Sequence, residues 1–255
     1  YSLTDIKLGG EYQFIGIENY IRMFTADVDL FNSLWVTVKY ILMVVPAKLI
    51  FALIVAMILS MKIKGIRIFR TMYYLPSILG GSVAISALWR VMFMKTGIIN
   101  NLLGTDINWL GDPKYALFTI GLIDIWQFGS SMILFLAALK QVPQDLYEAA
   151  EIDGAGRWKK LVHITFPTIR PTIILLLIMQ VGKTMNVGYE KILLLYNSTV
   201  YDTADVISTY VYRKGLLDFD YSYSTAVNLF NSVINFILVI VANKISSKLS
   251  ETSLF

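Results

Sequence analysis

The sequence predicts an all-α protein, a polytopic bundle of five membrane-spanning helices, on three observations. Hydrophobic residues make up 56% of the 255 residues and charged residues only 16%, against roughly 25% charged residues in typical soluble chains. The apolar residues are gathered into five runs instead of being spread at amphipathic spacing: 33–60, 75–94, 115–139, 171–185 and 227–242. A helix needs roughly 20 mainly apolar residues to cross a bilayer. The first three runs meet that length, and the last two meet it with their flanking Gly, Asn and Tyr residues.

The first segment, 1–31, is too polar to form a span or a signal peptide, and Tyr1 is not an initiator methionine. The sequence contains no internal repeat, low-complexity tract or boundary to a soluble domain. Residues 1–255 are therefore expected to form a single transmembrane domain.

The basic residues indicate which side of the membrane each loop occupies. Eleven of the 22 Lys and Arg residues follow the first, third and last runs, on alternate short loops, whereas seven are spread over longer segments on the opposite side. Loops rich in Lys and Arg are typically cytoplasmic. We therefore expect segment 143–167 and the C-terminus to lie in the cytoplasm, and the N-terminus outside.

The polar segment 143–167, between the third and fourth runs, predicts a helical hairpin. Asp145 can cap the first helix, and Glu148, three residues on, can reach back as in a capping box. Ala149 and Ala150 favour helix and keep its surface low, which suits a helix pressed into a groove of another protein.

The same segment carries signals for the end of the first helix and for a second one. Gly154 and Gly156 suit a helix end, because glycine tolerates left-handed backbone geometry. Residues 157–165 can form a second short helix, which we expect Phe166-Pro167 to end. An interfacial hairpin with basic residues facing lipid head groups is the alternative.

The spacing of Glu148-Ala149-Ala150, Gly154, Ile164 and Pro167 resembles the cytoplasmic loop of binding-protein-dependent ABC importer permeases. That resemblance implies a type I importer permease whose first hairpin helix docks as a coupling helix on an ATPase subunit. The ATPase-coupling residues that it implies are Glu148, Ala149, Ala150, Asp153 and Gly154.

Further segments resemble permeases for sugars. Gly16-Ile-Glu-Asn-Tyr20 is similar to a segment that precedes the second span of sugar permeases, and Arg70 and Pro76 match their next loop. Residues 201–228 and the terminal triplet 253–255 resemble permeases that import oligosaccharides released from polysaccharides.

The resemblance also implies what surrounds the chain. The expected partners are a second, homologous permease, two ATPase subunits that hold ATP and magnesium, an extracytoplasmic solute-binding protein, a carbohydrate substrate and membrane lipid. No cofactor in this chain and no nucleic acid are expected. Related permeases begin with one more span, so a sixth, N-terminal helix is expected to precede this chain.

The residues offer no catalytic constellation, so we do not expect an enzyme. The sequence has no cysteine, and His163 is its only histidine, which makes a metal site improbable. Gly182-Lys183-Thr184 looks like the end of a phosphate-binding loop, but position 177 is leucine where that motif requires glycine. ATP hydrolysis is expected on a separate chain.

Polar residues recur at helical spacing inside two runs, where charged groups usually face a protein interior or an aqueous cavity. Two such stripes could line a path for a hydroxyl-rich solute, with aromatic rings stacking on sugars; interhelical hydrogen bonding is the alternative. For Lys48, neutralisation of Asp124 and contact with a partner subunit stay equally open. The candidate pathway residues are Trp126, Gln180, Lys183, Asn186, Tyr189, Glu190, Asn228, Asn231 and Asn235.

These observations favour a permease subunit of an ATP-driven importer that carries an oligosaccharide by alternating access. An ABC permease for a non-sugar solute is the first alternative. A secondary transporter with its own proton or sodium site, and a membrane-embedded interaction protein without solute flux, are the others.

Overall fold

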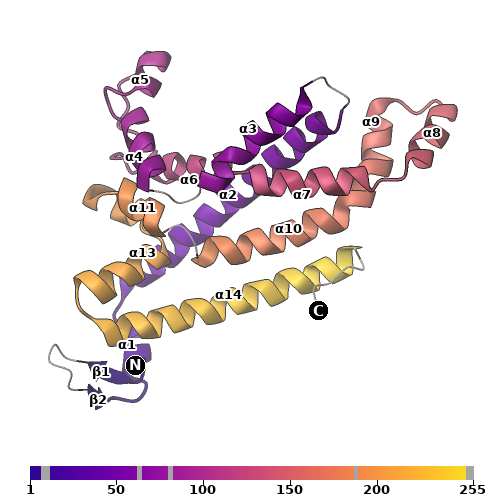
Figure 1. Cartoon of the computed structure of the whole chain (residues 1–255). Helices are drawn as coiled ribbons and strands as arrows, with labels where there is room; N and C mark the ends of the chain where they lie inside the picture. The colour runs from indigo at the N-terminus through magenta and orange to yellow at the C-terminus, as the bar shows by residue number, and fades with distance from the viewer. Residues whose placement is uncertain (7–11, 62–64, 80–82, 187–188, 251–255) are drawn as a thin grey trace. The chain divides into compact units, whose positions relative to one another are not determined.

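The structure is a computed structural model that describes residues 1–6, 12–61, 65–79, 83–186 and 189–250, apart from the side chains of 185, 186, 242 and 245–250. The described chain is helical except for one small antiparallel hairpin (Figure 1). Its elements are β1 Thr4–Ile6, β2 Tyr12–Phe14, α1 Glu18–Thr25, α2 Val28–Ser60, α3 Ile66–Leu79, α4 Val83–Met92, α5 Ile98–Leu103, α6 Ala116–Trp126, α7 Gly129–Lys140, α8 Gln144–Ile152, α9 Arg157–Lys160, α10 Phe166–Asn186, α11 Tyr189–Leu195, α12 Tyr201–Ala204, α13 Ile207–Tyr212 and α14 Tyr221–Ser250, with η turns at Leu161–Thr165, Ser198–Val200 and Arg213–Leu217. The predicted all-α class is confirmed.

The candidate spans agree with the apolar runs. Three helical segments are long and apolar enough to cross a membrane: Val28–Ser60, Arg157–Thr184 and Tyr221–Val241. Two helix pairs separated by short breaks, α3 with α4 and α6 with α7, meet the same test when each pair counts as one span. The described chain thus holds three to five candidate spans, consistent with the five runs.

The β-hairpin near the N-terminus was not predicted. Its register pairs Thr4 with Phe14 and Ile6 with Tyr12. Ile6 N–H also donates to the Ser222 hydroxyl at 2.9 Å, 216 residues away in sequence. Strands of three residues are too short to show an alternating pattern, so only the folded chain reveals them.

The end of the second hairpin helix corrects a prediction. Phe166-Pro167 does not end a helix; α9, a π-helical turn at Leu161–Thr165 and α10 follow one another without interruption. Phe166 N–H donates to Leu161 O, five residues back. Proline has no N–H and crowds the carbonyl four residues before it, and a π-turn is one way in which a helix absorbs such a defect.

The chain forms two compact units, each described here by itself. Unit 1 comprises 1–43, 81–123 and 181–239, and unit 2 comprises 44–80, 124–180 and 240–255. Because α2, α10 and α14 each contribute to both units, the units are not consecutive pieces of sequence. The single transmembrane domain over 1–255 stays a prediction.

In unit 2, one close approach requires a glycine at the start of α7. A Cβ placed on Gly129, the first residue of α7, would lie 2.4 Å from the Tyr73 carbonyl oxygen of α3. Only glycine allows the two backbones this close. The core of this unit gathers Ala138, Val142 and Ile169, against which Tyr147 of α8 packs.

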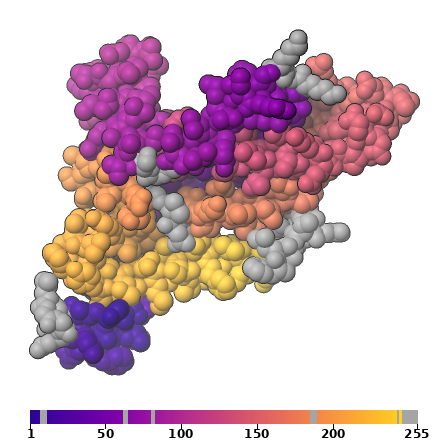
Figure 2. Space-filling view, viewed as in Figure 1, coloured from indigo at the N-terminus to yellow at the C-terminus, as the bar shows by residue number. Residues whose placement is uncertain are grey.

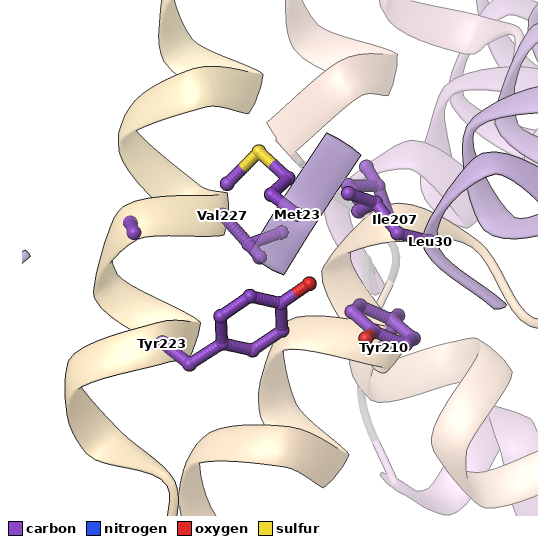
Figure 3. Close-up of a cluster of buried hydrophobic side chains, with 7 residues drawn as sticks. Met23, Leu30, Ile207, Tyr210, Tyr223 and Val227 are labelled. Carbon is purple, nitrogen blue, oxygen red and sulfur yellow. The ribbon is translucent and has the colours of Figure 1, made fainter. Parts of the chain in front are cut away.

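In unit 1, buried side chains from four helices meet in one cluster (Figure 3). Figure 3 shows Tyr210 of α13 and Tyr223 of α14 beside Met23 of α1 and Leu30 of α2. All four side chains are fully buried. The cluster therefore joins α1 and the start of α2 to α13 and the start of α14.

A half-buried carboxylate fastens this cluster. Asp27 Oδ1 accepts the N–H of Leu30 at 3.0 Å and so caps the start of α2. The hydroxyls of Tyr210 and Tyr223 both donate to its other oxygen. Burial alone would raise the pKa of Asp27, but the tyrosine hydrogen bonds outweigh burial, and its pKa lies below the usual value.

Replacing Asp27 with Asn is expected to lower the melting temperature of the detergent-purified protein by several degrees. Hydrogen bonds to a charged group stabilise by about 1.5–3 kcal/mol each, and the amide retains part of this. Because the folded pKa lies below 3.8, the contribution is present above about pH 4 and is lost as the pH falls through the folded value. The melting temperature of the variant should therefore fall less than that of the parent protein when the pH is lowered through this range.

Asp29→Asn, an exposed neighbour, is the matched control. Equal melting curves for both variants and the parent protein would contradict the assignment.

Candidate functional site

The predicted hairpin at 143–167 is present in unit 2. Its first helix, α8, begins at Gln144, so Asp145 is already inside the helix and cannot cap it. Pro143 is the N-cap residue, no side chain caps the helix, and Asp145 accepts only the N–H of its neighbour Leu146. The predicted capping box is therefore wrong. Asp145 still lies in the first turn, where a carboxylate is favoured by the helix dipole.

The end of α8 is built as predicted. Gly154 has a φ of +72°, the left-handed conformation in which side chains are strained. Its N–H donates to Glu151 O at 3.1 Å, and Ala155 N–H donates to Ala150 O at 2.8 Å. These two bonds form a Schellman motif. Gly156, by contrast, has a φ of −69° and begins α9 in extended geometry.

Two side-chain contacts hold the hairpin closed. The Tyr147 hydroxyl and the Thr165 hydroxyl are 2.7 Å apart, one on α8 and the other on the π-turn. Lys160 Nζ lies 3.1 Å from Glu151 Oε2. The side of α8 that carries Tyr147 and Glu151 therefore faces the second arm of the hairpin.

The opposite side of α8 has no cover within the described chain. No residue of α8 is buried, and the Ile152 side chain is 88% exposed. At 100° per residue, Asp145 and Ala149 share this outer side with Ile152, and Glu148, which is also exposed, lies at its edge. Figure 2 shows the surface of this segment in pink to salmon. The outer face is acidic around an apolar centre, the composition expected of a surface that receives a partner with basic residues.

The predicted pathway residues on α10 differ in their surroundings. Gln180 is buried and donates to the Ser131 hydroxyl of α7 at 3.0 Å, which matches the interhelical bonding alternative. Lys183 is exposed, as is Glu190 of α11. The side chain of Asn186 lies outside the described residues.

The three asparagines of the stripe on α14 differ in how deeply they are buried. Asn228 is exposed, whereas Asn231 is only 3% exposed. Asn235 donates to the Gly182 carbonyl of α10 at 3.5 Å. The Oδ1 atoms of Asn231 and Asn235 are buried without a hydrogen-bond partner among the described residues. Two unsatisfied acceptors one helical turn apart are positions where water or a solute hydroxyl can donate.

The two aromatic pathway candidates lie in separate places. Trp126 lines an apolar cavity of about 380 Å³ in unit 2, together with Tyr73 and Pro76. Tyr189, in unit 1, stacks on Tyr212 with ring centroids 5.9 Å apart. Trp126 and Tyr189 therefore belong to different units.

Sequence reasoning missed two groups of polar residues in unit 1. Asp27 gave no signal, because its tyrosine donors are more than 180 residues away. The second is the ion pair of Arg213 with Asp205, which is 2% exposed. Burial alone would lower the pKa of Arg213, but the carboxylate beside it outweighs that cost, and the pKa is raised.

Arg90 was also left unexplained by the sequence, although a charged residue within an apolar run is itself a signal. It lies on α4 and lines a second cavity, of about 200 Å³, in unit 1.

The described chain has several apolar helices of spanning length with polar groups on their faces. An acidic helix without cover in the described chain, α8, lies between two of them in sequence. Together these features define a membrane-embedded permease of the ABC class. The chain belongs to the family described as binding-protein-dependent transport system inner membrane component, whose model matches residues 23–251. It is a multi-pass membrane protein.

Individual relatives are similar over most of their length. The probable ABC transporter permease YesP of Bacillus subtilis (strain 168) is 39% identical over 96% of this chain and 82% of that one. The polygalacturonan/rhamnogalacturonan transport system permease YteP of the same organism is 33% identical over 97% of this chain and 78% of its own length. Among solved structures, a bacterial ABC transporter involved in import of the acidic polysaccharide alginate has a TM-score of 0.83 at 33% identity, over 93% of this chain and 85% of that one. A second solved structure, of a bacterial alginate ABC transporter in complex with an alginate pentasaccharide-bound periplasmic protein, has a TM-score of 0.82 at 33% identity, over 94% of this chain and 85% of that one.

Proposed function

We propose that this chain is a permease subunit of an ATP-driven importer that carries an oligosaccharide into the cytoplasm. The single observation that carries the proposal is the hairpin: a rigid helix with an acidic, uncovered outer face, in a family whose similar members are named for oligosaccharide and polysaccharide transport. Two side-chain contacts and the Schellman motif fix the geometry of this hairpin, whereas an interfacial anchor needs no fixed helix end.

In this proposal the outer face of α8 docks on an ABC ATPase subunit at the cytoplasmic side. Glu148 meets a basic group of that subunit, and Ala149 and Ala150 allow close contact. Asp153 and Gly154 fix where the helix ends. ATP-driven closure of two such ATPases pushes the hairpin, and the helices alternate between outward-facing and inward-facing states. ATP and magnesium are held by the ATPases.

A second, homologous permease would complete the membrane part, and an extracytoplasmic solute-binding protein would deliver the sugar. The structure of the similar alginate transporter with its periplasmic protein supports that arrangement. The excess of Lys and Arg on alternate loops supports a cytoplasmic hairpin and C-terminus.

The test is uptake by the transporter reconstituted with its companion subunits in proteoliposomes. The proposal expects accumulation of a labelled oligosaccharide that requires both ATP and the binding protein. Uptake without ATP, driven by an imposed proton or sodium gradient, would instead identify a secondary transporter.

Neutralising Lys183 and Glu190, the two exposed charges among the candidate pathway residues, tests the route of the solute. Lys183→Gln and Glu190→Gln are each expected to reduce uptake several-fold, because charged groups at membrane depth are retained where they face water or a solute. Co-purification of the ATPase subunits should stay unchanged, since neither residue lies on the hairpin. Unchanged uptake in both variants would remove them from the pathway.

A further inference from the structure

Unit 1 contains a small polar cavity whose lining residues have no role in the proposed function. It has a volume of about 200 Å³, and its polar lining consists of Arg90, Lys95, Asn108 and Asn197, with no carboxylate among its lining residues. In Figure 1, the two helices that flank it, α4 and α11, lie together. Two cations and two amides around one space form a site for an anion that also carries hydroxyl groups.

The loop that forms one wall of the cavity is held by a fully buried asparagine. Asn100 is 1% exposed. Its Nδ2 donates to the carbonyl oxygens of Lys95 at 2.9 Å and Ile107 at 2.8 Å. Its Oδ1 accepts from Trp109 Nε1 at 2.9 Å. One side chain thereby fixes the course of the loop on both sides of α5, so the positions of Lys95 and Asn108 are set by the fold.

Aromatic rings brace the same wall. Phe93, which lines the cavity, packs on Trp89 with ring centroids 5.1 Å apart and on Trp109 at 5.9 Å. Trp89 Nε1 in turn donates to Thr119 O of α6 at 3.0 Å. A preorganised wall reduces the ordering cost of binding. The four polar side chains that line the cavity are themselves exposed to solvent.

The charges of the cavity are available to a ligand. The Arg90 guanidinium has no hydrogen-bond or ion-pair partner in the part of the chain that the structure describes. Lys95 pairs with Asp106 at 3.1 Å, but their side chains are 62% and 75% exposed, and such surface pairs are weak enough for a ligand to displace. Arg90 also belongs to a helix of a candidate span. A charged side chain in a span has a high free-energy cost unless it faces an aqueous cavity, and such residues usually have a functional role.

We propose that this cavity binds the carboxylate of an acidic sugar residue, so that the imported oligosaccharide contains uronic acids. The inference rests on the proposed function and names its substrate class. The planar fork of Arg90 matches the two oxygens of a carboxylate, Lys95 adds a second positive charge, and the asparagine amides meet ring hydroxyls. Because the cavity is smaller than the roughly 300–1,000 Å³ of sites that enclose a whole small molecule, it holds one residue of a longer chain.

The experiment compares the acid and ester forms of the same sugars. The reconstituted transporter, in vesicles of phosphatidylcholine, is offered short oligosaccharides of galacturonate, mannuronate or glucuronate, and the methyl esters of each. Arg90→Gln is expected to raise the half-saturating concentration for an acid form about 10- to 100-fold, because charge-assisted hydrogen bonds contribute about 1.5–3 kcal/mol. The ester form should change by no more than about twofold. Since every variant uses the same binding protein, a change in the acid-to-ester ratio reports on the permease.

Lys114→Gln is the matched control, because Lys114 is an exposed cation near the same loop that does not line the cavity. Arg90→Lys should retain part of the preference for the acid. Equal losses for acid and ester, or no change in either, would overturn the proposal. Uptake of neutral sugars alone would overturn it and leave the proposed function standing, whereas ATP-driven uptake of no carbohydrate would overturn both. If the variant responds only when phosphatidylglycerol is added to the vesicles, the cavity belongs to a lipid head group and the proposal fails.

Discussion

Reversing the charge of Glu148 to lysine is expected to reduce ATP-driven uptake at least about tenfold. Glu148 is exposed at the edge of the outer side of α8, where nothing in the described chain covers it. A like-charge pair across an interface costs several kcal/mol, and each 1.4 kcal/mol is about a tenfold change in the equilibrium. The loss should therefore come from weaker docking of the ATPase subunit.

The measurement is uptake together with recovery of the ATPase subunit on the purified permease. Glu18→Lys is the matched control, since Glu18 is an exposed glutamate in the first turn of α1, which belongs to unit 1 and not to the hairpin. It should retain both. Normal uptake by Glu148→Lys, or full loss by Glu18→Lys as well, would contradict the role assigned to Glu148.

Changing Gly154 to valine is expected to uncouple transport without a steric clash. A Cβ at Gly154 has no heavy atom within 4 Å, so the substitution is strained only because its φ is +72°. A left-handed conformation costs a non-glycine residue roughly 1–2 kcal/mol, most for a β-branched one. The Schellman motif should open, and the outer face of α8 should no longer be presented at a fixed angle.

The chain supplies a close control for this substitution. Gly156 lies two residues on, also with no heavy atom within 4 Å of an added Cβ, but with a φ of −69°. Gly156→Val should leave uptake within about twofold, and Gly154→Asn, which tolerates the left-handed region, should retain most of it. Equal transport by Gly154→Val and Gly156→Val would show that the helix end does not matter.

The parts of the fold that the sequence predicted are those decided by local pattern. Apolar runs of spanning length and a polar segment with alanines followed by glycine are readable along the chain, because each depends on neighbours within a few residues. Even there, the start of α8 was misplaced relative to Asp145, since Pro143 rather than a side-chain cap begins the helix. The π-turn before Pro167 was missed because it needs the backbone of both flanking helices.

The parts that could not be predicted depend on distant partners. Asp27 looks like an ordinary cap until α13 and α14 bring two tyrosines to it. Nothing in the sequence distinguishes Asn100 from the other asparagines, because its hydrogen-bond partners are brought to it only when the loop folds. Arg90 was visible as a charge in an apolar run, but only the folded loop gives it a cavity to face.

Because the sequence contains no cysteine, a single introduced thiol reports on one position, and the contact of α8 can be measured directly. Cross-linking of Ala149→Cys in assembled transporter, with exposed Ser198→Cys as the control on the predicted extracytoplasmic side, tests whether the hairpin meets the ATPase. We expect Ala149→Cys to cross-link to the ATP-binding subunit and Ser198→Cys not to do so. An assembled, active transporter in which position 149 reaches no ATP-binding subunit, or is labelled from the external side, would contradict the account.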